Sequence, residues 1–163
     1  MKIKLLDIDR NVKKEFNFSV SNLEGIDLDG ELHVSGTVHK LSDEYLVEGK
    51  YSAKVKTQCV RCLDDIVVDL GEKEFQARFL TSEDYKKYLE TLAKAAVMTE
   101  DDYFEAVNGE IDILELVREE MVLEIPQYPA CIPECKDDSY IQKYSNDGID
   151  SRWSQLLNIK IKN

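Results

Sequence analysis

The chain has 163 residues, of which 43% are hydrophobic and 33% are charged, with seven Gly and three Pro. This composition is typical of one globular domain and excludes a disordered or fibrous protein. The formal net charge of −12 excludes a protein that coats nucleic acid by bulk charge attraction. Charges interrupt the first nine residues, and no apolar run approaches the ~18 residues of a membrane span. We therefore expect no signal peptide and a cytoplasmic protein.

The first half of the chain has the pattern of β-strands. Apolar and polar residues alternate over 15–20, 31–39, 45–57 and 66–79, and Gly, Asp, Asn and Ser separate these runs. Such alternation is typical of half-buried antiparallel strands. In the run 45–57 it directs Tyr51, Ala53 and Val55 inward. The basic side chains of the same run then share the outer face, and these are Lys50, Lys54 and Lys56.

After residue 80 the apolar spacing becomes helical. Five residues at this spacing predict a helix that Thr81 or Ser82 caps, and these are Tyr85, Tyr88, Leu89, Leu92 and Ala96. A second helix is predicted from Asp112, which forms a capping-box pattern with Glu115. This helix is expected to give way near Met121 to an apolar run over 122–125 that Pro126 ends. A last short helix is expected from Asp150, with Trp153 facing the core.

These elements predict an α+β fold with an antiparallel, partly barrel-like sheet and two or three helices. We expect a single domain over residues 1–163, composed of a β-rich part (1–80), an acidic helical region (81–125) and a cysteine-containing C-terminal tail (126–163). The acidity is concentrated in the helical region, since residues 82–124 contain thirteen acidic and four basic side chains.

Four cysteines form two close pairs that are far apart in the sequence. Cys59 and Cys62 follow the basic strand, and Cys131 and Cys135 lie in the tail. A reducing cytoplasm disfavours disulfides, and two such pairs suit a tetrahedral zinc site with one pair from each turn. Two alternatives remain open: free thiols, or a thioredoxin-like redox pair, which would need a helix N-terminus after a strand.

The chain contains none of the common catalytic motifs. There is no phosphate-binding Gly-rich loop, no nucleophile elbow and no HExxH helix motif. We therefore predict that the protein has no catalytic residues and is not an enzyme.

A basic stretch lies beside the first cysteine pair. Residues 49–63 contain Lys50, Lys54, Lys56 and Arg61 and no acid. These four side chains are the candidates for contact with RNA phosphates, because an acidic protein can still present a locally basic face. The alternative is that the lysines only keep an exposed sheet face soluble.

Four segments of the sequence resemble the YceD family of large ribosomal RNA subunit accumulation proteins. The run from Cys59 to Leu63 after a long hairpin looks like the family's central motif, and 108–120 leading into 122–126 resembles its Glu-rich helix followed by an apolar strand and Pro. Cys131 and Cys135-Lys136 stand where family members carry a Cys pair followed by Lys. Residues 150–157 resemble the family's terminal Asp-Pro-Arg helix. The chain departs from many relatives at 137–139, where Asp-Asp-Ser replaces a segment with further cysteines.

The resemblance implies a role in the synthesis, processing or stability of large-subunit (23S) ribosomal RNA, and it supplies no catalytic residues. The implied partner is this RNA or a precursor particle. A second hypothesis is a zinc-stabilised adaptor whose acidic region binds a basic ribosomal protein or assembly factor. A thiol oxidoreductase is a third.

Overall fold

The computed structural model describes residues 1–9, 13–95 and 102–136. The chain divides into two compact units, of which the first combines Met1–Thr57 with Val67–Gln127 and the second combines Gln58–Ile66 with Tyr128–Asn163. The first unit contains the described helices and most of the strand residues, and the second contains the four cysteines. The single domain over 1–163 stays a prediction.

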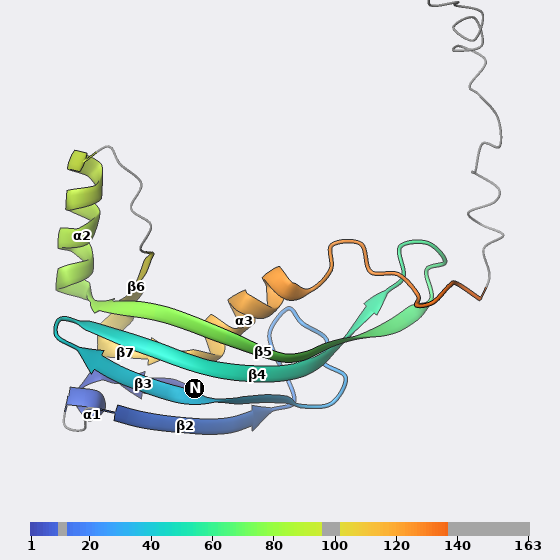
Figure 1. The fold of residues 1–163 in the computed structure, drawn as a ribbon, viewed down its shortest axis with the longest axis horizontal. Helices are drawn as coiled ribbons and strands as arrows, with labels where there is room; N and C mark the ends of the chain where they lie inside the picture. Colours follow the sequence, from blue (N-terminus) through green and yellow to red (C-terminus); the bar gives the residue numbers. More distant parts are fainter. Residues whose placement is uncertain (10–12, 96–101, 137–163) are drawn as a thin grey trace, which may run out of the picture. The chain divides into compact units, whose positions relative to one another are not determined.

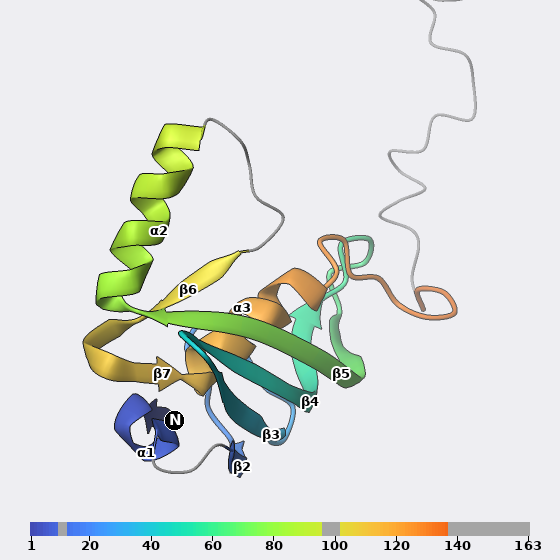
Figure 2. The same cartoon turned by 60° about the vertical axis from the view of Figure 1, so that its left-hand side comes forward.

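Five strands form the main sheet, in the order β2-β3-β4-β5-β6 (Figure 1). Their bounds are β2 Lys13–Val20, β3 Leu32–Leu41, β4 Glu44–Gln58, β5 Asp65–Thr81 and β6 Tyr103–Ala106. Strand β3 pairs antiparallel with β2 and β4, and β6 lies parallel to the end of β5. The sheet curls around its core like half a barrel (Figure 2). The four predicted strands and the predicted α+β class are confirmed, with shifted strand ends.

The predicted alternation on β4 is confirmed. Tyr51, Ala53 and Val55 are buried in the hydrophobic core, and the lysines between and before them are exposed. On the inner face Gly49 pairs with Gly36 of β3. A Cβ atom at Gly49 would lie 2.6 Å from Cζ of Phe75, and one at Gly36 would lie 2.6 Å from Cζ of Phe16. Backbone carbonyls are also in the way, since the Glu48 carbonyl oxygen would lie even closer to a Cβ at Gly36 and the Ser35 carbonyl oxygen would lie 2.6 Å from one at Gly49. Glycine is therefore required at both positions.

A second sheet of two short strands lies beside the N-terminus. Strand β1 (Lys2–Lys4) pairs antiparallel with β7 (Glu110–Asp112), and helix α1 (Leu5–Asp9) follows β1. A 3₁₀ turn, η1 (Val107–Gly109), connects β6 to β7. The sequence did not predict these elements, because three to five residues are too few to show a hydrophobic period.

Helix α2 (Ser82–Ala95) begins where the sequence predicts it. Thr81 Oγ1 accepts a hydrogen bond from the backbone N–H of Asp84 at 3.3 Å, so Thr81 is the capping residue. Tyr88 contacts Tyr103 of β6 edge to face, with ring centroids 5.0 Å apart. Ala96, predicted on the same helical face, lies outside the described residues, as does the helix expected from Asp150.

Helix α3 (Ile113–Glu124) begins at the predicted cap. Asp112 Oδ1 accepts hydrogen bonds from the N–H groups of Leu114 at 3.1 Å and Glu115 at 3.4 Å. The Glu115 carboxylate pairs with Arg118, one turn further along the helix. Four buried side chains of the helix complete the core of the sheet, and these are Ile113, Leu116, Val117 and Met121.

The predicted end of the helix near Met121, and the strand that the family resemblance implies over 122–125, are wrong, because α3 continues to Glu124. Met121 continues the helical spacing of the buried face, whereas Val122 and Leu123 are exposed. Pro126 favours extended backbone at the residue before it, and Ile125 adopts φ −66° and ψ 124°. The helix therefore ends only at the residue that precedes the proline.

Candidate metal centre and basic face

Two short loops bring the four cysteines together in the second unit. The loop between β4 and β5 carries Cys59 and Cys62, and the segment after α3 carries Cys131 and Cys135. The four Sγ atoms all lie within 4.8 Å of one another. The two pairs that the sequence grouped are therefore neighbours in space.

Backbone hydrogen bonds hold the first loop in shape and join it to the second. The Leu63 N–H donates to the Cys59 carbonyl at 2.9 Å, and the Cys59 N–H donates to the Asp64 carbonyl at 2.8 Å. The Val60 N–H donates to the Pro129 carbonyl at 2.9 Å. Leu63 is in the left-handed region at φ 65°, where glycine is the usual residue. The turn therefore forms even though the chain lacks the glycine typical of zinc ribbons.

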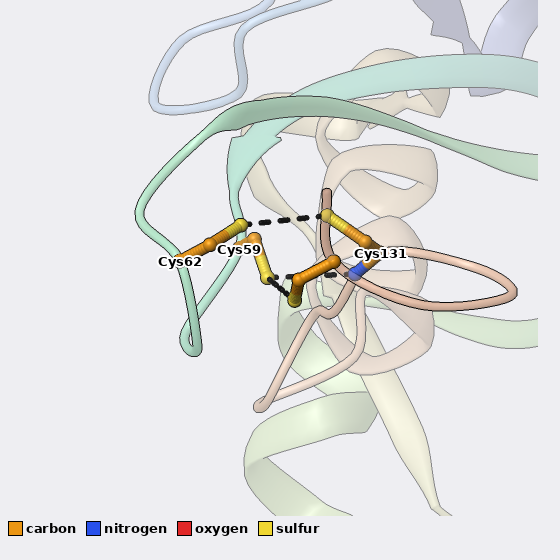
Figure 3. A group of neighbouring side chains, drawn as sticks. Cys59, Cys62 and Cys131 are labelled. Atoms are coloured by element: carbon orange, nitrogen blue, oxygen red, sulfur yellow. Dashed lines mark hydrogen bonds between the residues drawn. The ribbon is translucent and has the colours of Figure 1, made fainter. Parts of the chain in front are cut away.

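The sulfur atoms pair across the two loops. Sγ of Cys59 lies 3.7 Å from Sγ of Cys135, and Sγ of Cys62 lies 3.6 Å from Sγ of Cys131 (Figure 3). A disulfide bond would place two sulfurs about 2.05 Å apart, so all four residues are free cysteines. Each close sulfur–sulfur contact joins one loop to the other. A single ion at the centre of the four sulfurs would connect the two loops in the same way.

The sulfur geometry fits a tetrahedral zinc site. Four thiolates at the usual Zn–S distance of about 2.3 Å stand about 3.8 Å apart along the edges of a regular tetrahedron. The two cross-loop distances of 3.7 and 3.6 Å are close to that edge. Four sulfur ligands are also the donor set of structural zinc sites that leave no position open to substrate.

Peptide N–H groups point at one of the sulfurs. Cys59 Sγ accepts hydrogen bonds from the N–H groups of Arg61 and Cys131, each at 3.4 Å. The N–H of Cys62, followed by those of Arg61 and Cys131, lowers the pKa of Cys59 to about 5. The pKa of Cys131 is raised to about 12, chiefly through its hydrogen bond with Cys62. Burial raises the pKa of Cys135. The loops thus stabilise a thiolate at Cys59, the charged form that binds a metal.

The first cysteine pair has the wrong setting for a thioredoxin-like redox motif. Cys59 and Cys62 lie in a loop between two strands of the sheet, not at the start of a helix. A helix N-terminus is what activates the attacking thiolate in such motifs.

Arg61 lies in the same loop as the first cysteine pair, and its side chain hydrogen-bonds to the second cysteine loop. Its Nη2 donates a hydrogen bond to the Cys131 carbonyl at 2.8 Å. This contact connects the two cysteine loops through a side chain, in addition to the backbone bond between Val60 and Pro129. This role could not be predicted from the sequence, because a carbonyl acceptor 70 residues away produces no recognisable pattern.

The three candidate lysines share the outer face of the sheet, but each is paired with an acid. Lys50 Nζ lies 2.9 Å from Glu72, Lys54 Nζ lies 3.7 Å from Asp69, and Lys56 Nζ lies 3.7 Å from Asp29. The pairing with Glu72 raises the pKa of Lys50. Sequence reasoning missed these partners because Glu72 and Asp69 belong to the neighbouring strand β5 and Asp29 to the loop before β3.

Comparison with known proteins finds one family whose model matches the chain. The model of the family described as large ribosomal RNA subunit accumulation protein YceD matches residues 47–160. No curated protein and no solved structure matches the chain. Among the described residues, no helix has both the length and the apolar character to cross a membrane.

Proposed function

The chain belongs to the YceD family, and from this premise we propose that it supports the accumulation of large-subunit (23S) ribosomal RNA as a non-enzymatic cytoplasmic factor. The observation that carries the proposal is the family match, which includes both cysteine pairs and helix α3. The supported activity is assistance in the synthesis, processing or stability of this RNA. Its partners are the RNA or a precursor particle.

We include a zinc ion in this proposal, held by Cys59, Cys62, Cys131 and Cys135. A bound Zn²⁺ would supply no reaction chemistry here, because four protein thiolates fill its coordination sphere. It would cross-link the loop after β4 to the segment after α3. The support is the distance between sulfurs of different loops and the N–H groups directed at Cys59.

We also propose that the outer face of β4 contacts RNA phosphates through Lys50, Lys54 and Lys56. Each lysine is exposed and already pairs with a carboxylate, and exposed ion pairs of this kind are weak and screened by salt. A phosphate can therefore replace the carboxylate partner at little cost. Arg61 is a separate candidate contact in the cysteine unit, where one of its nitrogens is already engaged by Cys131.

A gene-deletion strain tests the family-based function. We expect the ratio of large-subunit to small-subunit ribosomal RNA during fast growth to fall in the deletion strain and to recover with the intact gene. The double variant Cys59→Ser, Cys62→Ser should restore the ratio only in part at matched protein levels, because loss of two thiolates removes metal-linked folding energy.

The matched control is Ser35→Ala with Gln76→Ala, two changes on the exposed sheet face, which should restore the ratio fully. A normal ratio in the deletion strain would contradict the ribosomal function. Full rescue by the cysteine variant would show instead that this function does not need the metal site.

A further inference from the structure

A groove in the first unit lies where β6, η1 and β7 meet helix α3. It has a volume of about 240 Å³, and neither a cysteine nor a lysine of β4 lines it. Its lining comes from β1, from the end of β5, from the segment that runs from β6 through β7, and from the first two turns of α3. Figure 2 shows how β6 leads through the turn into β7 and then into α3.

The floor of the groove is apolar and partly aromatic. Phe79 of β5 and Phe104 of β6 lie with ring centroids 5.5 Å apart, and Leu116 of α3 adds a buried aliphatic side chain. Phe104 remains 38% exposed and Val107 remains 57% exposed. Phe79 and Leu116 belong to the hydrophobic core, so the groove floor is part of the core surface, with the ring of Phe104 partly open to solvent.

The rim of the groove is strongly acidic. Glu105, Glu110 and Glu119 line it and form no ion pair with any residue that the structure describes. Glu105 and Glu110 are also only partly exposed. The basic side chain in the lining, Lys2, lies 3.9 Å from Asp112. Lys4 stands opposite Glu110 in the register of β1 with β7 but is not part of the lining.

We propose that this groove binds a basic, arginine-bearing segment of a protein partner. A guanidinium group can stack on the exposed face of Phe104 while its N–H groups bind a rim carboxylate, which combines cation–π attraction with a paired hydrogen bond. An ammonium group offers no flat surface for such stacking, so arginine should bind more tightly than lysine. RNA does not suit the groove, because three unpaired carboxylates repel phosphate.

The proposal stands on the groove alone and does not depend on the role in ribosomal RNA accumulation. It gives the acidic helical region a defined contact point. A ribosomal particle contains both RNA and basic proteins. The lysines on β4 would contact RNA phosphates, and the acidic groove would contact arginine side chains of a basic protein.

Fluorescence anisotropy with short labelled peptides tests the proposal on the full chain. The probes are an alternating Arg-Gly octapeptide, its Lys-Gly counterpart and a single-stranded RNA of matched length. We expect saturable binding of the Arg peptide, weaker binding of the Lys peptide, and loss of affinity as salt increases. The double variant Glu105→Gln, Glu110→Gln should weaken binding of the Arg peptide about tenfold or more, since it removes two charge-assisted contacts.

Glu31→Gln with Glu74→Gln is the matched control, because it removes the same charge from exposed sites outside the groove. This control should bind the Arg peptide like the unchanged protein, and Phe104→Leu should abolish the preference for arginine over lysine. If both double variants weaken binding of the Arg peptide equally, the peptide is attracted by the overall negative charge of the protein, and the proposal is overturned. Absence of saturable peptide binding, or RNA binding that Glu105→Gln, Glu110→Gln weakens, would also overturn it.

Discussion

At the scale of single residues, Tyr51 is the polar side chain whose burial has the clearest consequence. The residue is 2% exposed, its ring contacts Phe75, and its hydroxyl finds no hydrogen-bond partner among the described residues. Burial, with the nearby charges of Glu124 and Glu120, raises the pKa of Tyr51 to about 12. The alternating pattern of β4 predicted that Tyr51 faces inward. It could not predict the unpaired hydroxyl, which depends on what packs over the ring.

This pKa predicts a loss of stability in alkali. Between pH 10 and pH 12 the unfolded chain releases the Tyr51 proton while the folded chain retains it, so the free energy of unfolding falls as pH rises. Across this window we expect the free energy of unfolding of the unchanged protein to fall by on the order of 2 kcal/mol because of Tyr51. The variant Tyr51→Phe should lack this fall. Below pH 9 the variant should be as stable as the unchanged protein or slightly more stable, because an unpaired buried hydroxyl is lost.

Urea unfolding at a series of pH values measures this difference. Tyr128→Phe is the matched control, since Tyr128 is 78% exposed and should leave the pH dependence unchanged. Parallel pH profiles for the unchanged protein and Tyr51→Phe would contradict the account of this hydroxyl.

At the scale of elements, the cap of α3 shows which helix boundaries a sequence can predict. The sequence predicted Asp112 as the cap at the start of α3, because its side chain can accept hydrogen bonds from free N–H groups locally, and the structure confirms this. The end of the same helix was predicted several residues too early. Val122 and Leu123 are apolar but exposed, so the run from Val122 to Ile125 resembles a buried strand in sequence without being one.

We expect Asp112→Ala to destabilise the protein by about 1 kcal/mol, because two N–H groups of α3 lose their acceptor. The matched control is Glu119→Ala, which removes an exposed carboxylate from the same helix without removing a cap. Chemical denaturation should place the control within about 0.5 kcal/mol of the unchanged protein. Equal effects of the two changes would mean that charge, not capping, determines the stability of this helix.

Strand β4 shows a second limit of sequence patterns. Alternation placed Lys50, Lys54 and Lys56 on one exposed face, as the structure confirms. It could not reveal their acidic partners, because pairing with β5 depends on how the strands lie side by side. The face is therefore a row of exchangeable ion pairs instead of an uncompensated basic patch.

The proposed contact with RNA predicts a specific effect of these lysines. Replacing all three with Gln should weaken binding to a large-subunit RNA fragment about tenfold and reduce the dependence of affinity on salt, since fewer phosphates are contacted. The matched control replaces Lys13, Lys86 and Lys94, three exposed lysines on other elements, with Gln. Electrophoretic mobility shifts at several salt concentrations compare the two. If both triple variants bind alike, β4 is not the contact surface.

At the scale of the whole molecule, the cysteine cluster was predictable and the acidic groove was not. The two Cys pairs can be recognised in the sequence, because a metal-binding turn needs two ligands that are only a few residues apart. The groove combines side chains from β5, β6, β7 and α3, and two of these strands were too short to predict. A site built from such pieces becomes visible only in the folded chain.

The zinc content of untagged protein is the direct test of the proposed four-cysteine zinc site. Elemental analysis by mass spectrometry, on protein purified without chelator and again after incubation with zinc and desalting, should find about one zinc ion per chain. The variant Cys59→Ser, Cys131→Ser removes one ligand from each loop and should retain no stoichiometric zinc. Zinc at one equivalent in the intact protein and its loss in the variant is the predicted result. An intact, folded chain that binds no zinc under either condition would contradict the account.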